Sequence, residues 1–130
     1  MAFRLVTLNL NGIRSAASKG LLEWAQSVGA DCMGVQELKA QADDVAGRYD
    51  TLAGLKGHFH YAQKKGYSGV GLYVKKKPSA VITGLGDPEF DAEGRYVEAR
   101  FDTARRRLIL ISCYFSSGSS GVDRQAAKFR

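Results

Sequence analysis

The first third of the sequence most constrains the fold, because it predicts two strands joined by one helix. Residues 3–10 (FRLVTLNL) alternate between a face with Phe3, Leu5 and Thr7 and a near-continuously apolar face, which is typical of a largely buried strand. After Ser18, a candidate N-cap, apolar residues recur at helical spacing as far as Gly29, a typical helix stop. A second short apolar run covers residues 31–35. A strand–helix–strand unit of about 35 residues predicts a right-handed crossover with two parallel strands side by side.

Polar side chains follow both of these strands. Asn9 and Asn11 end the first strand, and Glu37 follows the second one within the stretch VQELK. Ligand-binding residues of open α/β sheets tend to lie just past the carboxyl ends of strands. A carboxylate fixed there can hold a hard cation, although a strand-end Glu is also commonly just solvated. Asn9 lies between two leucines and is expected to be substantially buried. Two roles stay open for it: capping the following turn, or hydrogen bonding to a metal-bound carboxylate or phosphate.

From His58 onward the sequence changes to short strands separated by glycine, proline and charged turns. Five such runs follow, namely HFHYA, SGVGLYVK, SAVITGLG, RYVEARFD and RLILISCYF. This spacing predicts an antiparallel meander with Arg105–Arg107 at one solvated hairpin tip. His58 and His60 share one strand face, which we expect to be exposed. Residues 122–130 predict the first turns of a helix with no helix-ending residue, so we expect the chain to be incomplete there.

The charge balance favours a polyanionic partner such as nucleic acid. The chain has 19 Lys and Arg against 13 Asp and Glu, which gives a net charge of +6 at pH 7. Residues 64–69 (KKGYSG) interleave cations with an aromatic ring. That pattern suits phosphate contact combined with packing on a sugar or base, and it equally suits a plain hairpin turn.

Length and cysteine usage exclude several classes of protein. With 130 residues the chain has the length of one domain. Cys32 and Cys113 each lie in an apolar run, which predicts buried thiols rather than a disulfide or a zinc site. The sequence contains no P-loop and no Ser/His/Asp nucleophile arrangement. Because no apolar stretch is long enough for a signal peptide or a membrane span, we expect a cytoplasmic protein with no membrane partner.

Five blocks, in order, carry a resemblance to a known family: TLNLNGIRSA, GADCMGVQELKA, KKGYSGVGLYV, GLGDPEFDAEGRYVEARFD and ILISCYFSSGSSGVDRQAAKFR. Together they resemble the exonuclease III-like apurinic/apyrimidinic endonucleases. The resemblance implies a four-layer α/β sandwich with mixed sheets and flanking helices, of which residues 1–130 would be the N-terminal half. It also implies hydrolysis of double-stranded DNA at abasic sites and from 3′ ends, dependent on Mg²⁺ or Mn²⁺, by a protein that is monomeric at full length.

The resemblance also implies roles for individual residues. It places the metal-binding glutamate at Glu37 and, at Asn9, an asparagine beside the metal with a catalytic role. Tyr114 corresponds to the active-site tyrosine that contacts the target phosphate. The implied DNA-binding set comprises Arg14 and Lys19 on the backbone, Tyr67 in the minor groove and Arg95 in support of the rim beside the site.

The sequence departs from the family pattern in three ways. Leu38 replaces a threonine, Ser116 replaces a proline, and the family's second half, with its aspartate and histidine, is absent after Arg130. We therefore expect no evident general base, no activity of the chain alone and one sheet's inner face left uncovered. Two alternatives stay open: a non-catalytic or degenerate DNA-binding fragment, and a phosphoesterase of the same superfamily with a non-DNA substrate.

Overall fold

The computed structural model describes residues 3–103 and 105–115. These residues form one five-stranded sheet, ordered β1-β2-β5-β4-β3, and one three-stranded sheet, ordered β6-β7-β8. The elements in chain order are β1 (Leu5–Asn9), α1 (Ile13–Ser18), α2 (Leu21–Val28), β2 (Cys32–Gln36), α3 (Ala42–Val45), β3 (Thr51–Leu52), β4 (Leu55–His60), β5 (Val70–Val74), β6 (Ala80–Thr83), α4 (Pro88–Asp91), β7 (Tyr96–Asp102) and β8 (Arg107–Cys113). No helix within these residues is long and apolar enough to cross a membrane.

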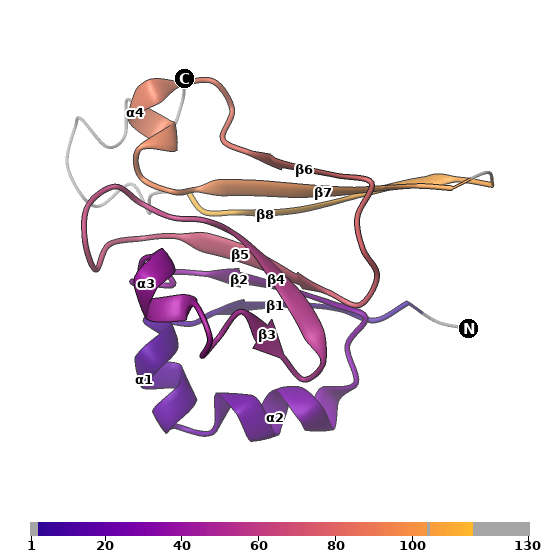
Figure 1. The fold of residues 1–130 in the computed structure, drawn as a ribbon, viewed down its shortest axis with the longest axis horizontal. Helices are drawn as coiled ribbons and strands as arrows, with labels where there is room; N and C mark the ends of the chain where they lie inside the picture. Colours follow the sequence, from indigo (N-terminus) through magenta and orange to yellow (C-terminus); the bar gives the residue numbers. More distant parts are fainter. Residues whose placement is uncertain (1–2, 104, 116–130) are drawn as a thin grey trace.

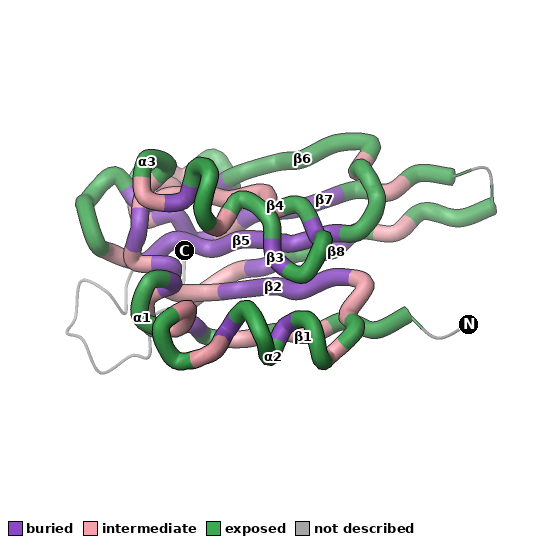
Figure 2. Tube along the Cα trace, turned by 60° about the horizontal axis from the view of Figure 1, so that its bottom comes forward, coloured by how far each residue is buried: buried purple, intermediate pink, exposed green. Residues whose placement is uncertain are grey.

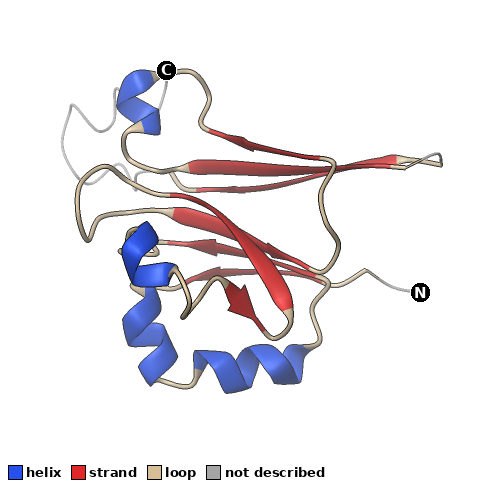
Figure 3. Cartoon of the chain, viewed as in Figure 1, coloured by secondary structure: helices blue, strands red, loops and turns tan. Residues whose placement is uncertain are grey.

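The elements pack as three layers, with the five-stranded sheet in the middle. Helices α1 to α3 lie on one face of this sheet, and the three-stranded sheet lies on the other (Figures 1 and 3). Alternate residues of the central strands therefore supply two separate cores. Met33, Val35 and Tyr73 belong to the core beneath the helices. Leu72 and Val97 belong to the core between the sheets. The mixed α/β class expected from the sequence is confirmed.

The predicted crossover is present at the N-terminus. Strands β1 and β2 are parallel, and α2 between them ends at Gly29, which adopts the left-handed conformation with φ of 66°. One feature differs from the prediction, because the residues before α2 form a helix of their own, α1. Ser18 is therefore the last residue of α1, and Gly20 occupies the N-cap of α2.

Strand β1 is not largely buried, which corrects the sequence-based expectation. It is an edge strand of the five-stranded sheet, and its residues alternate between exposed and half-buried. Val6 and Leu8 pack against the helix-side core, whereas Leu5, Thr7 and Asn9 are exposed. The apolar run in the sequence did not distinguish an edge strand from a central one, since only sheet order decides how many faces are covered.

The predicted single meander is divided between the two sheets. Strand β5 pairs with β4 on one side and with β2 on the other, so the first two predicted runs belong to the five-stranded sheet. The connection through residues 75–79 then leads to the antiparallel meander β6-β7-β8. The β7–β8 hairpin closes where Asp102 pairs with Arg107, so Arg105 and Arg106 lie at its tip, as predicted, whereas Arg107 already belongs to β8. Helix α3 and the short strand β3 were not predicted, and the predicted helix at 122–130 lies outside the described residues.

Apolar surface is uncovered in two places. At edge strand β1, Leu5 shares a sheet face with its register partner Cys32, which belongs to the core between the sheets, and Leu5 is 55% exposed. The inner face of the five-stranded sheet is therefore uncovered at this edge, as expected, and the outward face of the three-stranded sheet is uncovered as well.

On the outward face of the three-stranded sheet, Ile109 and Ile111 are 50% and 49% exposed, and their register partners on β7 are Arg100 and Glu98. Figure 2 shows β6 exposed along its length, whereas β2 and β5 in the middle layer are mostly buried. Away from β1 the inner faces of the two sheets cover each other, because β2 and β5 pack directly against β7 and β8.

Both cysteines are free, as predicted. Cys32 is fully buried, and burial raises the pKa of its thiol to about 11. Cys113 is half-buried, and burial raises its pKa as well. A thiol that stays protonated is a weak nucleophile and a poor metal ligand, so both side chains serve as small apolar packing groups.

His58 and His60 do not form an exposed pair, which corrects the expectation. Both lie on the face of β4 that is turned toward the three-stranded sheet, and Nδ1 of His60 accepts a hydrogen bond of 3.3 Å from the backbone N–H of Tyr96. Nε2 of His58 is buried and has no hydrogen-bond partner among the described residues. Burial, and secondly the charge of Lys56, holds the pKa of His58 below its ordinary value.

We expect His58 to make the free energy of unfolding depend on pH. Because its pKa is lower in the folded chain, the unfolded chain binds the proton more readily as pH falls below about 6.5. Stability is therefore fully present above that pH and decreases toward the lower pKa of the folded state. Urea denaturation at several pH values between about 7.5 and 5.5 should show a weaker pH dependence for His58→Leu than for the parent chain. Identical pH dependence in both proteins would contradict this assignment.

Candidate functional site

The carboxyl ends of β1 and β2 form one rim of the five-stranded sheet. Asn9 and Gln36 are register partners in the parallel pair, and the N–H of Leu10 donates to the carbonyl of Gln36 at 2.9 Å. Glu37 directly follows Gln36. The parallel pairing therefore brings Asn9 and Glu37 to the same rim, as the order of the strands in the sequence predicted.

The backbone of Glu37 is held in an unusual conformation. Its φ of 54° lies in the left-handed region, which costs an L-residue roughly 1–2 kcal/mol. Hydrogen bonds from two neighbouring loops maintain it: the N–H of Gly12 donates to the carbonyl of Glu37 at 2.8 Å, and the N–H of Leu38 donates to the carbonyl of Gly69 at 3.0 Å. A strained residue that its surroundings hold in place is common at functional sites. The direction in which the Glu37 side chain leaves the backbone is thereby set.

The Glu37 carboxylate is available to bind a cation. It is half-buried and makes no hydrogen bond or ion pair within the part of the chain that the structure describes. Mg²⁺ is usually bound in proteins through one or two carboxylates and keeps several water or phosphate ligands, so one fixed carboxylate fits this ion. Groups of three or more His, Cys, Asp or Glu side chains that could cage a metal are absent from the described residues.

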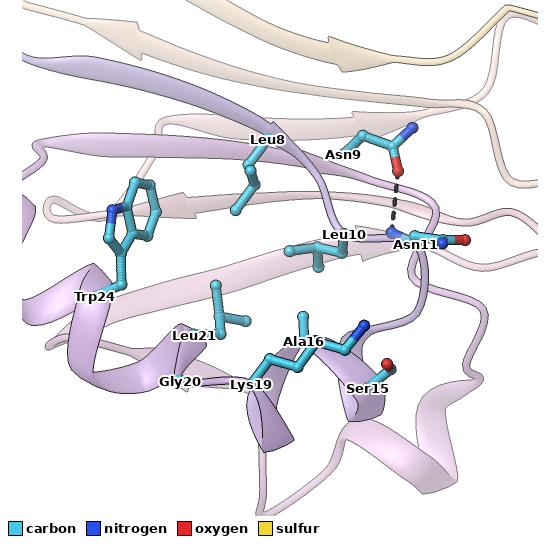
Figure 4. Close-up of a pocket in the computed structure, with 10 residues that line it drawn as sticks. All are labelled: Leu8, Asn9, Leu10, Asn11, Ser15, Ala16, Lys19, Gly20, Leu21 and Trp24. Atoms are coloured by element: carbon cyan, nitrogen blue, oxygen red, sulfur yellow. Dashed lines mark hydrogen bonds between the residues drawn. The ribbon is translucent and has the colours of Figure 1, made fainter.

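Asn9 caps the turn that follows its strand. Its Oδ1 accepts a hydrogen bond of 3.0 Å from the N–H of Asn11, drawn as the dashed line in Figure 4. This is one of the two roles predicted for it. The expectation that Asn9 is buried was wrong, because Asn9 lies on the face of edge strand β1 that is turned toward the three-stranded sheet, and that sheet leaves this edge uncovered. Its amide NH₂ group points away from the turn (Figure 4) and remains able to donate a hydrogen bond to a ligand.

A hollow beside Asn9 brings Lys19 into the same region. Its wall is apolar, formed by Leu10, Leu21 and Trp24, and its polar margin includes Asn9 and Lys19 (Figure 4). Lys19 is exposed, at the C-terminal end of α1. An exposed lysine at this end of the sheet suits contact with a phosphate oxygen.

Arg14 lies on the first turn of α1, and its side chain is 55% exposed. One guanidinium nitrogen donates to the carbonyl of Lys39 at 3.3 Å, and the other lies 3.7 Å from a carboxylate oxygen of Asp44. The hydrogen bond from the backbone of Gln41, and secondly the charge of Arg14, holds the pKa of Asp44 below its ordinary value. Arg14 is thus directed to the Glu37–Lys39 turn while most of its side chain stays accessible.

Tyr114 follows β8 and is held by Arg95. The N–H of Tyr114 donates to the carbonyl of Arg95 at 3.0 Å, and Arg95 Nη1 donates back to the carbonyl of Tyr114 at 3.3 Å. The guanidinium carbon also lies 5.4 Å from the centre of the tyrosine ring. Arg95 is only 4% exposed and forms an ion pair with Glu93. Arg95 therefore has little exposed surface with which to contact DNA, and its contacts hold Tyr114 in place at the end of β8.

A hydrogen-bonded bridge joins the two sheets behind the rim. Gln36 Nε2 donates to Ser112 Oγ at 3.0 Å and to Thr7 Oγ1 at 3.2 Å. Ser112 Oγ in turn donates to the carbonyl of Val35 at 2.9 Å. This bridge ties the strand end that carries Glu37 to the one that carries Tyr114. Sequence reasoning missed both bridging residues, although Gln36 directly precedes Glu37.

The loop that contains Tyr67 lies against the Glu37–Lys39 turn. The carbonyl of Ser68 accepts a hydrogen bond of 2.7 Å from the N–H of Lys39, next to the bond between Leu38 and Gly69. Tyr67 is half-buried, and the Lys64 ammonium lies 5.4 Å from the centre of its ring. Cation and aromatic ring therefore stack on each other within this loop.

Leu38, a departure from the family pattern, has a clear packing role. Its side chain is fully buried in the helix-side core. A Cβ atom at position 69 would lie 3.2 Å from the Cβ of Leu38, and Gly69 has φ of 93°. Leucine at 38 and glycine at 69 therefore depend on each other. Ser116, the other substituted position, lies outside the described residues.

We expect Gly69→Ala to destabilise the fold more than Gly66→Ala. Both glycines have positive φ, so each alanine incurs a backbone cost of about 1 kcal/mol. Only position 69 adds a close contact with Leu38, whereas a Cβ at 66 meets nothing within 4 Å. Overpacking should add about 1–3 kcal/mol to the loss at 69. Urea denaturation of both variants measures the difference in the free energy of unfolding. Equal losses in the two variants would show that Leu38 shifts enough to accept a Cβ atom at position 69.

Comparison with known proteins agrees with this geometry. The model of the endonuclease/exonuclease/phosphatase family matches residues 6–128. A DNA-(apurinic or apyrimidinic site) endonuclease of Dictyostelium discoideum is 29% identical, over 93% of this chain and 32% of its own length. An exodeoxyribonuclease of Bacillus subtilis is 30% identical, over 93% of this chain and 46% of its own.

Solved structures give the same result. The crystal structure of the Xenopus laevis APE2 catalytic domain superimposes with a TM-score of 0.76 and 26% identity, over 97% of this chain and 49% of that domain. The chain thus spans between about a third and a half of the length of these relatives. Since the family match covers almost every residue, the chain belongs to the endonuclease/exonuclease/phosphatase family.

Proposed function

We propose that this chain contributes the metal-binding and DNA-facing part of a nuclease that hydrolyses DNA phosphodiesters at abasic sites and from 3′ ends. The observation that carries the proposal is the Glu37 carboxylate, which has no partner among the described residues and is held on a strained, clamped turn. The relatives named as abasic-site endonuclease and exodeoxyribonuclease support the substrate. We further propose double-stranded DNA as the partner, a monomeric full-length protein and a cytoplasmic location.

Each residue of the rim would have a separate task. Glu37 would hold Mg²⁺, or Mn²⁺ in its place, and a bound metal ion neutralises charge on the phosphate oxygens during hydrolysis. Asn9 would donate a hydrogen bond from its amide NH₂ group, while its Oδ1 remains engaged with Asn11. Tyr114 would donate from its hydroxyl to the target phosphate. Arg95 would act as a positioning residue for Tyr114 through their reciprocal hydrogen bonds.

DNA contact would extend outward from the reacting phosphate. Arg14 and Lys19 are exposed and lie beside the Glu37 turn and the Asn9 hollow, where they would bind flanking phosphates without reading sequence. Tyr67 would pack into the minor groove next to them. The sequence left open a phosphoesterase of the same superfamily with a non-DNA substrate. The basic charge of the chain favours DNA over such a substrate.

Binding to DNA tests the proposal directly. We expect the chain to bind a labelled duplex with an abasic-site analogue in EDTA, with an affinity that falls as salt rises. Replacing Arg14 and Lys19 by Ala should lower the slope of log affinity against log salt by about 1.8, for two lost phosphate contacts. Glu37→Ala should leave binding without metal unchanged or stronger, since it removes a negative charge near the phosphates. Fluorescence anisotropy across a salt series measures the DNA affinity of the parent chain, of the Arg14/Lys19 variant and of Glu37→Ala.

The control removes a cation that belongs to neither end proposed as a contact surface. Lys56 is exposed on β4, where it pairs in register with Val74, so Lys56→Ala should leave the slope for the abasic duplex unchanged. Equal slopes for the rim variant and the parent chain would place Arg14 and Lys19 off the DNA and reject the proposed rim.

We also expect that the chain alone does not nick abasic DNA in Mg²⁺. The rim as described offers one unpaired carboxylate, and hydrolysis also requires a base to activate water. Incubation of the purified chain with an abasic duplex, with the Bacillus subtilis exodeoxyribonuclease as positive control, measures this on a denaturing gel. Strong Mg²⁺-dependent nicking that Glu37→Ala abolishes would show that the chain itself contains the complete machinery.

A further inference from the structure

A second groove lies at the end of the sheets opposite the Glu37 rim. Val74, the last residue of β5, pairs with Cys32 at the start of β2, whereas Glu37 follows the end of β2. In Figure 1 this end carries the start of β1, the β5–β6 connection and the β7–β8 hairpin, and α1, α3 and α4 lie at the other end. We define the basic groove by six lining residues: Phe3, Lys75, Lys76, Lys77, Phe101 and Arg106.

The charge of the basic groove suits a polyanion. Its lining contains four cations and two carboxylates, Asp31 and Asp102, and the next cations along the chain, Arg105 and Arg107, flank it on the hairpin. Asp31 is partly engaged, since it accepts a hydrogen bond of 2.8 Å from the N–H of Arg4. Its other oxygen lies 4.0 Å from Lys75 Nζ, and the Lys75 side chain is still 69% exposed. A loose pair of this kind contributes little stability and leaves the ammonium able to bind phosphate.

The floor of the basic groove is apolar and aromatic. Val74 and Leu110, at the edge of the core between the sheets, line it from below. Phe3 is 50% exposed at one side, and Phe101 is half-buried at another. Aromatic rings beside a row of cations form the arrangement on which single-stranded nucleic acids bind, with phosphates on the cations and bases on the rings.

We infer that the basic groove binds single-stranded nucleic acid, with Phe3 as a base-stacking platform and Lys75–Lys77 and Arg106 as phosphate contacts. A duplex would use the cations alone, because its bases are already stacked on one another. The groove is separate from the rim, since the six residue steps from Asp31 to Glu37 correspond to roughly 20 Å of extended strand. This inference does not depend on the nuclease proposed for the rim.

Binding of a fluorescein-labelled oligothymidylate of about ten nucleotides to the chain tests the inference. Phe3→Ala should weaken this affinity about fivefold or more, the low end for one lost stacking contact, and leave the salt slope unchanged. The triple change Lys75→Ala, Lys76→Ala and Lys77→Ala should lower the slope by about 2, because each lost contact to a single strand accounts for about 0.7.

Two matched controls separate the groove from the rim. Leu85→Ala removes another exposed apolar side chain, 58% exposed beyond β6, and should leave oligothymidylate binding unchanged. Replacement of Arg14 and Lys19 by Ala should also leave oligothymidylate binding unchanged, while it weakens binding of the abasic duplex. The experiment can therefore reject the proposed groove without rejecting the proposed rim, and the reverse.

Three outcomes would overturn the inference. The first is an effect of Phe3→Ala no larger than that of Leu85→Ala. The second is a loss of oligothymidylate affinity in the rim variant equal to that in the triple-lysine variant. The third is displacement of the oligonucleotide by polyglutamate as strong as by unlabelled oligothymidylate, which would identify a surface for polyanions in general.

Discussion

The hydrogen bonds that clamp the Glu37–Lys39 turn are the interactions on which the rim depends. Backbone groups of Gly12 and Ile13 donate to this turn from the start of α1, and the turn donates to the loop that follows Tyr67. Three loops that are distant in sequence therefore share one set of backbone hydrogen bonds. These bonds hold Glu37 in a conformation with positive φ that L-residues adopt only at a cost in free energy. A carboxylate that binds a metal needs this kind of fixed support.

The rim is a joint product of both sheets. The five-stranded sheet supplies Asn9 and Glu37, and the three-stranded sheet supplies Tyr114 together with Arg95. The bridge from Gln36 to Ser112 crosses between the sheets immediately behind these residues. Because each of its polar atoms has a partner, the bridge tolerates partial burial and fixes how the two strand ends lie relative to each other. Neither sheet alone could position the whole set.

Exposed cations gather at the two ends of the sandwich, whereas the buried cation Arg95 is paired. Exposed Arg14 and Lys19 lie at the rim, and the lysines and arginines of the basic groove lie at the opposite end. Arg95 is instead buried and paired with Glu93. On the outward face of the three-stranded sheet, hydrogen bonds from Tyr96 and then Arg100 hold the pKa of Glu98 below its ordinary value. Net positive charge therefore does not identify a contact surface, since burial and pairing determine which cations can reach a ligand.

The sequence by itself determined the local elements and which residue types end them. The β1–α2–β2 crossover, the Gly29 helix stop, the hairpin tip at Arg105 and Arg106 and the placement of Asn9 and Glu37 at strand ends all follow from local pattern. Tertiary structure alone decided that β1 is an edge strand, that the later strands divide between two sheets, and that His58 and Arg95 are enclosed. Periodicity describes how a segment alternates between two faces but not what covers each face. Sheet order and layer packing depend on contacts between residues far apart in the chain, which no local pattern contains.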